Sequence, residues 1–256
     1  MNKITTYFTK ENIFIGLIVS VSFLLSSALI GNAITHLRST DEISVSGTAE
    51  KLVKSDAGKW TFSLSRTSRE DNYNEVSKAM KDDRDNTIKY LVTRGVAKED
   101  ILVQPLSSSK ICAKQEDESY ADAGKDCRGN FSYSLLQKIV VDSSNVDEIQ
   151  DLSLNAAQIL AVKGITIKTA SVEYFYNGLS SLKTTLLSEA MKNAKERADA
   201  LANSTHSKVG GVKTASQGVF QITAKNSIDV SDYGSYDTSG IEKKVTAVVR
   251  ASFSVN

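Results

Sequence analysis

The chain has 256 residues, of which 41% are hydrophobic and 24% are charged, and its 31 basic side chains nearly balance its 30 acidic ones. The formal net charge of +1 excludes the strongly basic footprint of a nucleic-acid-binding domain, so no nucleic-acid partner is predicted. One Pro, two Cys and two His exclude a proline-rich chain, a disulfide-dense mini-domain and a histidine-rich metal site.

The first predicted element is a membrane-spanning helix over residues 13–35. No residue from Asn12 to Thr35 is charged, and the apolar run from Ile13 to Ile34 reaches the length of about 20 residues that a helix needs to cross a bilayer. A cleavable signal peptide is the alternative, with Gly31-Asn32-Ala33 as a small-x-small cleavage site. An uncleaved anchor is favoured, because the run exceeds the roughly 7–15 residues of a signal-peptide core.

The charges beside this span predict its orientation. Lys3 and Lys10 precede it, whereas Arg38 alone follows it closely. By the positive-inside bias, the N-terminus is expected in the cytoplasm and the main part of the chain on the other side of the membrane. The predicted organisation is a cytoplasmic N-terminus (1–12), a transmembrane helix (13–35), a tether (36–42) and an exported domain (43–256).

The exported part alternates between strands of period two and helices of period 3.6. Predicted strands lie around residues 43–49, 60–65, 101–108, 131–141, 165–176, 209–219 and 245–255, with a bulge between Ile167 and Val172. The first of three predicted helices opens at the capping box Ser68-x-x-Asp71, the second opens at Ser144-x-x-Asp147, and the third runs over 181–204. This pattern predicts an α+β fold in which about three helices pack on a mostly antiparallel sheet.

Two cysteines, Cys112 and Cys127, bound the stretch AKQEDESYADAGKD. In an exported chain an even pair predicts a disulfide, and closing a loop of about 15 residues is worth roughly 3 kcal/mol in the chain-entropy model. The enclosed stretch is acidic and poor in apolar residues, so residues 110–130 are interpreted as an exposed insertion stapled by this bridge. A redox-active pair is the alternative, but the CxxC spacing that would support it is missing.

Short motifs stand at both ends of the exported part. Ile43-Ser-Val-Ser-Gly-Thr-Ala-Glu opens it, and Glu189-Ala-Met-Lys-Asn-Ala-Lys-Glu-Arg-Ala-Asp-Ala-Leu-Ala, Lys208-Val-Gly-Gly-Val-Lys and the strand 245–255 follow in order near its end. In sequence and spacing they resemble the SIMPL-domain family of bacterial envelope proteins, which includes the periplasmic immunogenic proteins. The chain departs from the family pattern at Ser55-Asp56, where members often have Pro-Asp, and in the Cys-bounded insertion.

The resemblance implies a periplasmic domain held at the inner (cytoplasmic) membrane by a single-pass anchor. It also implies assembly into a homo-oligomer, which in some members is a large ring, and no settled biochemical activity or catalytic residues. The expected partners are therefore the membrane, through Ile13 to Ile34, further copies of the chain, and an envelope protein whose identity the sequence does not give.

No catalytic constellation is predicted from the residues themselves. Gly178-Leu-Ser-Ser-Leu lacks the final glycine of a nucleophile elbow, so Ser180 is interpreted as a helix N-cap. His206 falls at the end of the long predicted helix, where the helix dipole favours a cation, and His36 falls at the level of the lipid headgroups. Gly210-Gly211 lacks the Lys-Ser/Thr of a P-loop and is interpreted as a bulge.

Acidic residues are the candidates for metal binding, but no metal site and no cofactor are predicted. Asp82, Asp83 and Asp85 point in different directions on a helix and are interpreted as a solvated face. Two acidic loops offer oxygen ligands that suit Ca²⁺, although neither follows the EF-hand pattern. They contain Glu116, Asp117, Glu118, Asp122 and Asp126 in the insertion, and Asp229, Asp232 and Asp237 near the end, where Tyr233 and Tyr236 suggest an adaptable contact surface.

The leading hypothesis is a membrane-anchored envelope protein that self-assembles and acts as a structural or interaction module without catalysis. An envelope hydrolase, built from scattered Ser, Asp and Tyr residues, is an alternative that a pocket with convergent carboxylates would favour. A stress-protective, chaperone-like factor is a third hypothesis, and it predicts an exposed apolar patch larger than a few hundred Å².

Overall fold

The computed structural model describes residues 10–38, 41–112, 131–228 and 231–256. These residues form an α+β fold with four α-helices and mostly antiparallel sheets, which confirms the predicted fold class. The chain divides into two compact units: Met1–Gly47, Met191–Ser216 and Val249–Asn256 make up unit 1, and Thr48–Ala190 and Gln217–Val248 make up unit 2.

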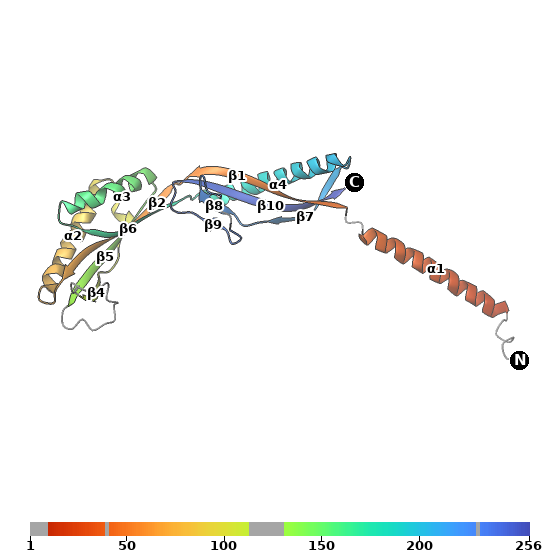
Figure 1. Cartoon of the computed structure of the whole chain (residues 1–256), viewed down its shortest axis with the longest axis horizontal. Helices are drawn as coiled ribbons and strands as arrows, with labels where there is room; N and C mark the ends of the chain where they lie inside the picture. Colours follow the sequence, from red (N-terminus) through yellow and green to blue (C-terminus); the bar gives the residue numbers. More distant parts are fainter. Residues whose placement is uncertain (1–9, 39–40, 113–130, 229–230) are drawn as a thin grey trace, which may run out of the picture. The chain divides into compact units, whose positions relative to one another are not determined.

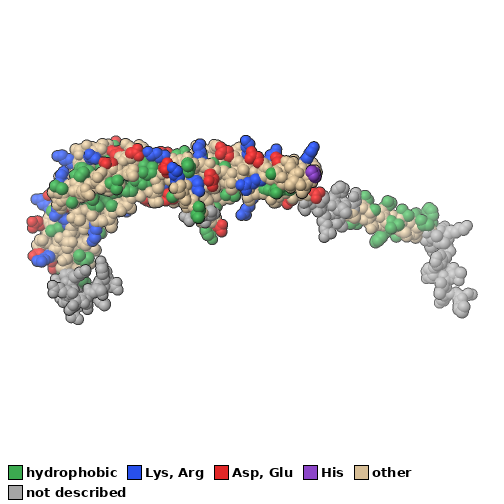
Figure 2. All heavy atoms as spheres, turned by 45° about the horizontal axis from the view of Figure 1, so that its top comes forward, with side chains coloured by type: hydrophobic (Ala, Val, Ile, Leu, Met, Phe, Trp, Pro, Cys, Tyr) green, Lys and Arg blue, Asp and Glu red, His purple; other side chains and the backbone are tan. Residues whose placement is uncertain are grey.

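Helix α1, Lys10–Arg38, contains the predicted apolar span (Figure 1). Its segment Phe14–Gly31 is long and apolar enough to cross a membrane, and none of it is buried; Figure 2 shows hydrophobic side chains along it. Ser20 Oγ and Ser22 Oγ donate to the carbonyl oxygens four residues earlier, at 2.7 and 2.9 Å. Because these hydroxyls are satisfied within the helix, they fit a hydrocarbon environment. Helix α1 therefore suits a membrane anchor or a signal sequence.

Unit 2 contains a five-stranded sheet with the order β3-β5-β2-β6, in which β4 also pairs with β5. All of these pairs are antiparallel. In chain order the elements are β2 (Ala57–Ser68), α2 (Tyr73–Thr93), the 3-10 helix η2 (Lys98–Asp100), β3 (Ile101–Val103), β4 (Ser107–Cys112), β5 (Phe131–Ser143), α3 (Val146–Ala161) and β6 (Ile167–Phe175). When β3 and β4, which both pair with β5, are counted as one interrupted strand, this β-α-β-β-α-β succession is the split βαβ motif (Figure 1).

The core of unit 2 lies between this sheet and helices α2 and α3. Alternate residues of β2 point into the core, among them Trp60, Phe62 and Leu64, which are fully buried. They form one cluster with buried side chains of both helices, including Met80, Leu91, Ile149, Leu152 and Leu160. Burying a large apolar side chain is worth about 1.5–3 kcal/mol, so this face of the sheet supplies much of the stability of unit 2.

Gly58 continues the buried side of β2 beneath α3, and we predict that this position requires glycine. A Cβ at Gly58 would lie 3.1 Å from Ile149 Cγ2. Gly58→Ala is expected to lower the free energy of unfolding by about 1–3 kcal/mol, the usual cost of overpacking. Urea unfolding followed by the fluorescence of Trp60, the single tryptophan, measures this loss. Gly211→Ala is the control, because no atom lies within 4 Å of the added Cβ; equal losses for both variants would contradict the prediction.

The second sheet has the strand order β1-β10-β8-β9, and β7 also pairs with β10. Its strands are β1 (Glu42–Lys54), β7 (Val209–Gln217), β8 (Gln221–Ala224), β9 (Ser235–Tyr236) and β10 (Glu242–Val255), and helix α4 (Leu179–Ser204) precedes β7. In unit 1, Ala194 and Ala198 of α4 form a buried cluster with Ala251 and Phe253 of β10. The small alanine side chains let the helix lie close to the strand.

The bounds of several strands differ from the prediction. The strand expected over 101–108 is two strands, β3 and β4, which are separated around Pro105, a residue without the N–H that a continuous ladder needs. Strand β8 was not predicted, since its four residues are too few to show a clear period. The bulge predicted between Ile167 and Val172 is confirmed by a shift in the pairing of β2 with β6.

Both predicted capping boxes are wrong by a few residues. Helix α2 begins after Asn72, whereas Ser68 ends β2 and is buried. Helix α3 begins after Asn145, whose side-chain oxygen accepts a hydrogen bond from Glu148 N at 3.2 Å. In each case an asparagine closer to the first turn takes the N-cap position.

Candidate functional site

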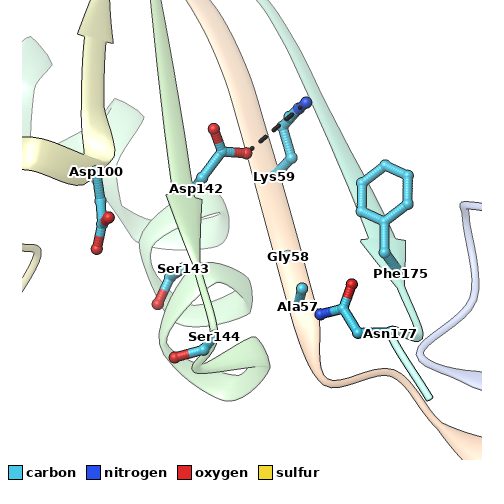
Figure 3. Close-up of a pocket in the computed structure, with 9 residues that line it drawn as sticks. All are labelled: Ala57, Gly58, Lys59, Asp100, Asp142, Ser143, Ser144, Phe175 and Asn177. Atoms are coloured by element: carbon cyan, nitrogen blue, oxygen red, sulfur yellow. Dashed lines mark ion pairs between the residues drawn. The ribbon is translucent and has the colours of Figure 1, made fainter.

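An open groove lies where β2 begins and where β5 and β6 end (Figure 3). This polar groove has a volume of about 450 Å³ and is lined by Ala57, Gly58, Lys59, Asp100, Asp142, Ser143, Ser144, Phe175 and Asn177. Its side chains come from four segments that are distant in the sequence, an arrangement that is typical of small-molecule sites.

Charges of both signs face the polar groove. Lys59 Nζ lies 3.8 Å from Asp142 Oδ1 and 5.8 Å from the centre of the Phe175 ring. Asp100 supplies a second carboxylate (Figure 3). Because the side chains of Lys59 and Asp142 are 39% and 57% exposed, their ion pair contributes at most about 1 kcal/mol. The groove therefore has charged groups available for the ammonium or carboxylate groups of a small polar ligand.

The serine hydroxyls of the polar groove do not form a nucleophile–histidine pair. Ser143 Oγ accepts a hydrogen bond from Asn145 N at 3.0 Å and lies 3.3 Å from Glu148 Oε2. Both contacts fasten the first turn of α3. Neither of the chain's two histidines lines the groove, so a general base of that kind is not placed beside these serines.

A fully buried lysine holds the loop that precedes β10. Lys243 is 0% exposed, and its Nζ donates to Asp237 O at 2.5 Å and to Gly240 O at 2.7 Å. The Asp237 carboxylate lies 3.7 Å from the same nitrogen. We call these three residues the Lys243 clamp. An ammonium without water must find such partners, because an unpaired buried charge is very costly.

The clamped loop is bonded to a strand of unit 2 and to the connection between β1 and β2. Tyr174 N donates to Thr238 O at 2.7 Å, and Ser55 N donates to Ile241 O at 2.8 Å. Tyr174 belongs to β6, and Ser55 directly follows β1, two residues before β2 begins. The Lys243 clamp thus orders the connection from β9 to β10 against β6, which also contributes Phe175 to the polar groove.

The electrostatics of the clamp follow from its burial. Burial lowers the pKa of Lys243, although Asp237 acts in the opposite direction. Burial alone would raise the pKa of Asp237, but hydrogen bonds from Ser239 and Gly240, together with Lys243, hold that pKa below its usual value. Shifted pairs of this kind mark functional sites in many proteins. Here the hydrogen bonds of the ammonium go to the loop itself, which indicates a structural role.

The Lys243 clamp was missed by the sequence analysis, although a signal for it exists. Lys243 has the same strand parity as Val245 and Ala247, and all three point to the buried side of β10. A lysine in that register has to be paired within the protein. The partner loop, however, has no pattern that identifies it in advance.

Several residues singled out in the sequence lie apart from the polar groove. Ser180 is the second residue of α4, so its predicted role as N-cap is wrong. His206 follows α4 with a positive φ of 59°, and His36 lies in α1. Gly210-Gly211 lies in β7, where an added Cβ at Gly210 would collide with Ser254.

The prediction for the aspartates of α2 is wrong for one of the three. Asp82 and Asp85 are exposed, but Asp83 is only 5% exposed. Its carboxylate accepts two hydrogen bonds from Arg66 of β2, at 2.5 and 2.8 Å. The physical reason is its position on the helix face that carries Met80 and packs against the sheet.

The remaining candidates are only partly described. Cys112 ends β4, whereas Cys127, the acidic residues of the insertion and Asp229 lie outside the described residues, so the disulfide remains a prediction. Asp237 belongs to the Lys243 clamp, and Asp232 is exposed. Within the described ranges, no three His, Cys, Asp or Glu side chains are grouped so that they could hold a metal ion.

The fold and the sequence together define the class of this protein: an α+β domain that follows a helix able to cross a membrane. Residues 43–253 match the SIMPL family, which is described as a protein of unknown function, and the chain belongs to this family. The resemblance inferred from the terminal motifs is thus confirmed. A comparison with curated proteins finds no match.

Proposed function

We propose that this protein is a membrane-anchored module of the cell envelope that assembles with copies of itself and acts by contact rather than by catalysis. The observation that carries the proposal is the exposure to solvent of large apolar side chains between β8 and β9 of unit 2. Ile228 is 92% exposed and Tyr233 is 98% exposed. Exposed large apolar side chains that are close to one another in the chain favour an interaction surface.

The strand edges support the same proposal. Strand β1 stands at the end of its sheet, and residues 211–217 of β7 are all exposed. Neither strand contains a proline, which would hinder pairing with another chain. The lysines of both strands give only some protection against such pairing. A second chain could therefore add contacts along these edges once an apolar contact brings the copies together.

Anchoring favours association by confinement. In the proposed topology, α1 spans the inner membrane once, the N-terminus faces the cytoplasm and the domain is periplasmic. Confined to one surface, copies meet at a higher effective concentration than free chains would. The test is size-exclusion chromatography with multi-angle light scattering on the detergent-extracted full chain. A mass of several protomers is expected, and a single-protomer mass at all micromolar concentrations would refute self-assembly.

The proposed compartment predicts a disulfide between Cys112 and Cys127. We expect no thiol of the full chain to react with a maleimide–polyethylene glycol reagent after denaturation without reductant, and two thiols to react after reduction. Cys112→Ser should leave one reactive thiol without reductant, and this variant serves as the control for labelling. Two reactive thiols in protein taken from intact cells would contradict both the bridge and an oxidising compartment.

A further inference from the structure

We propose that the polar groove binds short peptides of two or three residues that have a free amino group and a free carboxylate. The groups available for this ligand are one lysine, two carboxylates and several uncharged hydrogen-bonding side chains, all of them in unit 2. The inference goes beyond the proposed assembly, because a peptide in this groove requires no contact between copies of the chain.

One side of the groove carries two carboxylates. Ile101 of β3 pairs with Val141 of β5, so Asp100, which precedes the first, and Asp142, which follows the second, stand on neighbouring segments (Figure 3). Like charges on adjacent strands repel each other, and an ammonium beside both carboxylates removes this repulsion. The Ser144 hydroxyl faces the same side of the groove and, like the Asp100 carboxylate, has no partner within the described part of the chain.

The other side of the groove carries a lysine, an amide and an aromatic ring. Lys59 of β2 stands opposite Asp142, but its Nζ lies 3.8 Å from Asp142 Oδ1, which is too far for a hydrogen bond. The ammonium of Lys59 therefore keeps its N–H donors for an incoming carboxylate. Asn177, whose side chain is also without a partner among the described residues, supplies a further N–H donor, and the Phe175 ring offers an apolar surface.

This mixture of charges selects a ligand that carries both signs. The carboxylates of Asp100 and Asp142 disfavour a ligand that is only anionic, and the ammonium of Lys59 disfavours a ligand that is only cationic. A zwitterion places its ammonium beside the carboxylates and its own carboxylate beside Lys59. The volume of about 450 Å³ lies in the range of small-molecule sites.

The spacing of the strands sets the length of the ligand. In the order β3-β5-β2, the segments that carry Asp100 and Lys59 are two strand spacings apart, so their backbones are separated by about 10 Å. An extended peptide spans about 3.3–3.6 Å per residue, so two or three residues connect an ammonium at Asp100 to a carboxylate at Lys59. Asp142, on the strand between them, is placed to accept a hydrogen bond from the backbone of the peptide. A single amino acid is too short to reach both ends.

Contacts inside the protein hold both sides of the groove in place. Asp56 N donates to Phe175 O at 2.9 Å, and Asp56 Oδ1 accepts from Asn177 N at 2.8 Å. The Phe175 ring also lies 6.4 Å from the Tyr236 ring, measured between their centres. On the opposite side, Ser143 Oγ is bonded to the first turn of α3. A groove that is ordered before binding loses less entropy when the ligand enters.

Trialanine is the probe, and saturation-transfer difference NMR on the full chain in detergent measures its binding. We expect a dissociation constant of about 0.1–1 mM, the range that the usual ligand efficiency gives for a molecule of this size. N-acetyl-trialanine and trialanine amide each lack one charged terminus, and each should bind about tenfold more weakly. Diaminobutane and succinate, which carry charges of one sign only, should also bind about tenfold more weakly than trialanine.

Two variants assign the ends of the peptide to their partners. Asp100→Asn should weaken trialanine about tenfold and leave N-acetyl-trialanine unchanged, because that ligand has no ammonium to lose. Lys59→Met should weaken trialanine about tenfold and leave trialanine amide unchanged, because that ligand has no carboxylate. A general disturbance of the fold would not produce these selective losses. Asp85→Asn and Lys168→Met, which remove exposed charges outside the groove, should keep the affinity of the wild type.

No saturation transfer to trialanine at about 10 mM would overturn the inference. Equal affinities for diaminobutane and trialanine would also overturn it, because the groove would then be a site for cations. If neither Asp100→Asn nor Lys59→Met changes the affinity for trialanine, the peptide binds elsewhere and the groove is not its site. None of these results depends on the mass of the assembly, so a failure here leaves the proposed function intact.

Discussion

Replacing Asp83 with alanine is expected to lower the free energy of unfolding by about 3 kcal/mol, because the change leaves the Arg66 guanidinium without its partner. The two side chains make a bidentate pair between α2 and β2, with hydrogen bonds of 2.5 and 2.8 Å. Hydrogen bonding with Asp83 also raises the pKa of Arg66, despite the opposing effect of burial. Since Arg66 is 33% exposed, the loss should fall at the lower end of the range for buried pairs.

Urea unfolding with Trp60 fluorescence measures this prediction, and two comparisons test its cause. Asp85→Ala, on the same helix and 53% exposed, should change stability by less than about 0.5 kcal/mol. The double variant Arg66→Met/Asp83→Leu should recover most of the loss, because removing both charges leaves neither unpaired. If the double variant is as unstable as the sum of the single variants, the pairing does not account for the effect.

The periodicity of the sequence was sufficient for the parts of the fold where burial alone decides the structure. The alternation of Trp60, Phe62 and Leu64 predicted β2, and the alanine-rich stretch predicted α4. The same periodicity also indicates the buried ion pair between Asp83 and Arg66, which was not predicted. Asp83 fills the gap between Met80 and Thr87 on the buried face of α2, and Arg66 continues the buried parity of Leu64. An acidic residue on the buried face of a helix and a basic residue on the buried side of a strand indicate that the two form an ion pair with each other.

What could not be predicted depends on contacts between distant segments. The sheet order β3-β5-β2-β6 brings η2, β5 and β6 beside the start of β2, and only this order creates the polar groove. The same is true of the loop before β10, where Lys243 binds carbonyl groups that any sequence provides. Backbone acceptors leave no signature in the choice of residue, so a clamp made from them is found only in the structure.

Lys243→Met is the second substitution for which we expect a large effect, a loss of about 3 kcal/mol in the free energy of unfolding. The change leaves the carbonyls of Asp237 and Gly240 without their donor, and each unsatisfied buried acceptor costs about 1–3 kcal/mol. Lys51→Met is the control, because Lys51 is exposed on β1. An equal loss in both variants would show that the clamp contributes nothing.

The dependence on pH distinguishes the charge of Lys243 from its packing. Burial, partly opposed by Asp237, lowers the pKa of Lys243 from its ordinary value of 10.5. Between the lowered pKa and 10.5, the unfolded chain holds more protons than the folded one, so the free energy of unfolding of the wild type gains from rising pH. Lys243→Met lacks this gain, whereas the other titrating groups are common to both proteins. The difference in stability between wild type and variant should therefore grow as the pH is raised from neutral toward 10.5, and a constant or shrinking difference would mean that the ammonium of Lys243 is not desolvated in the folded protein.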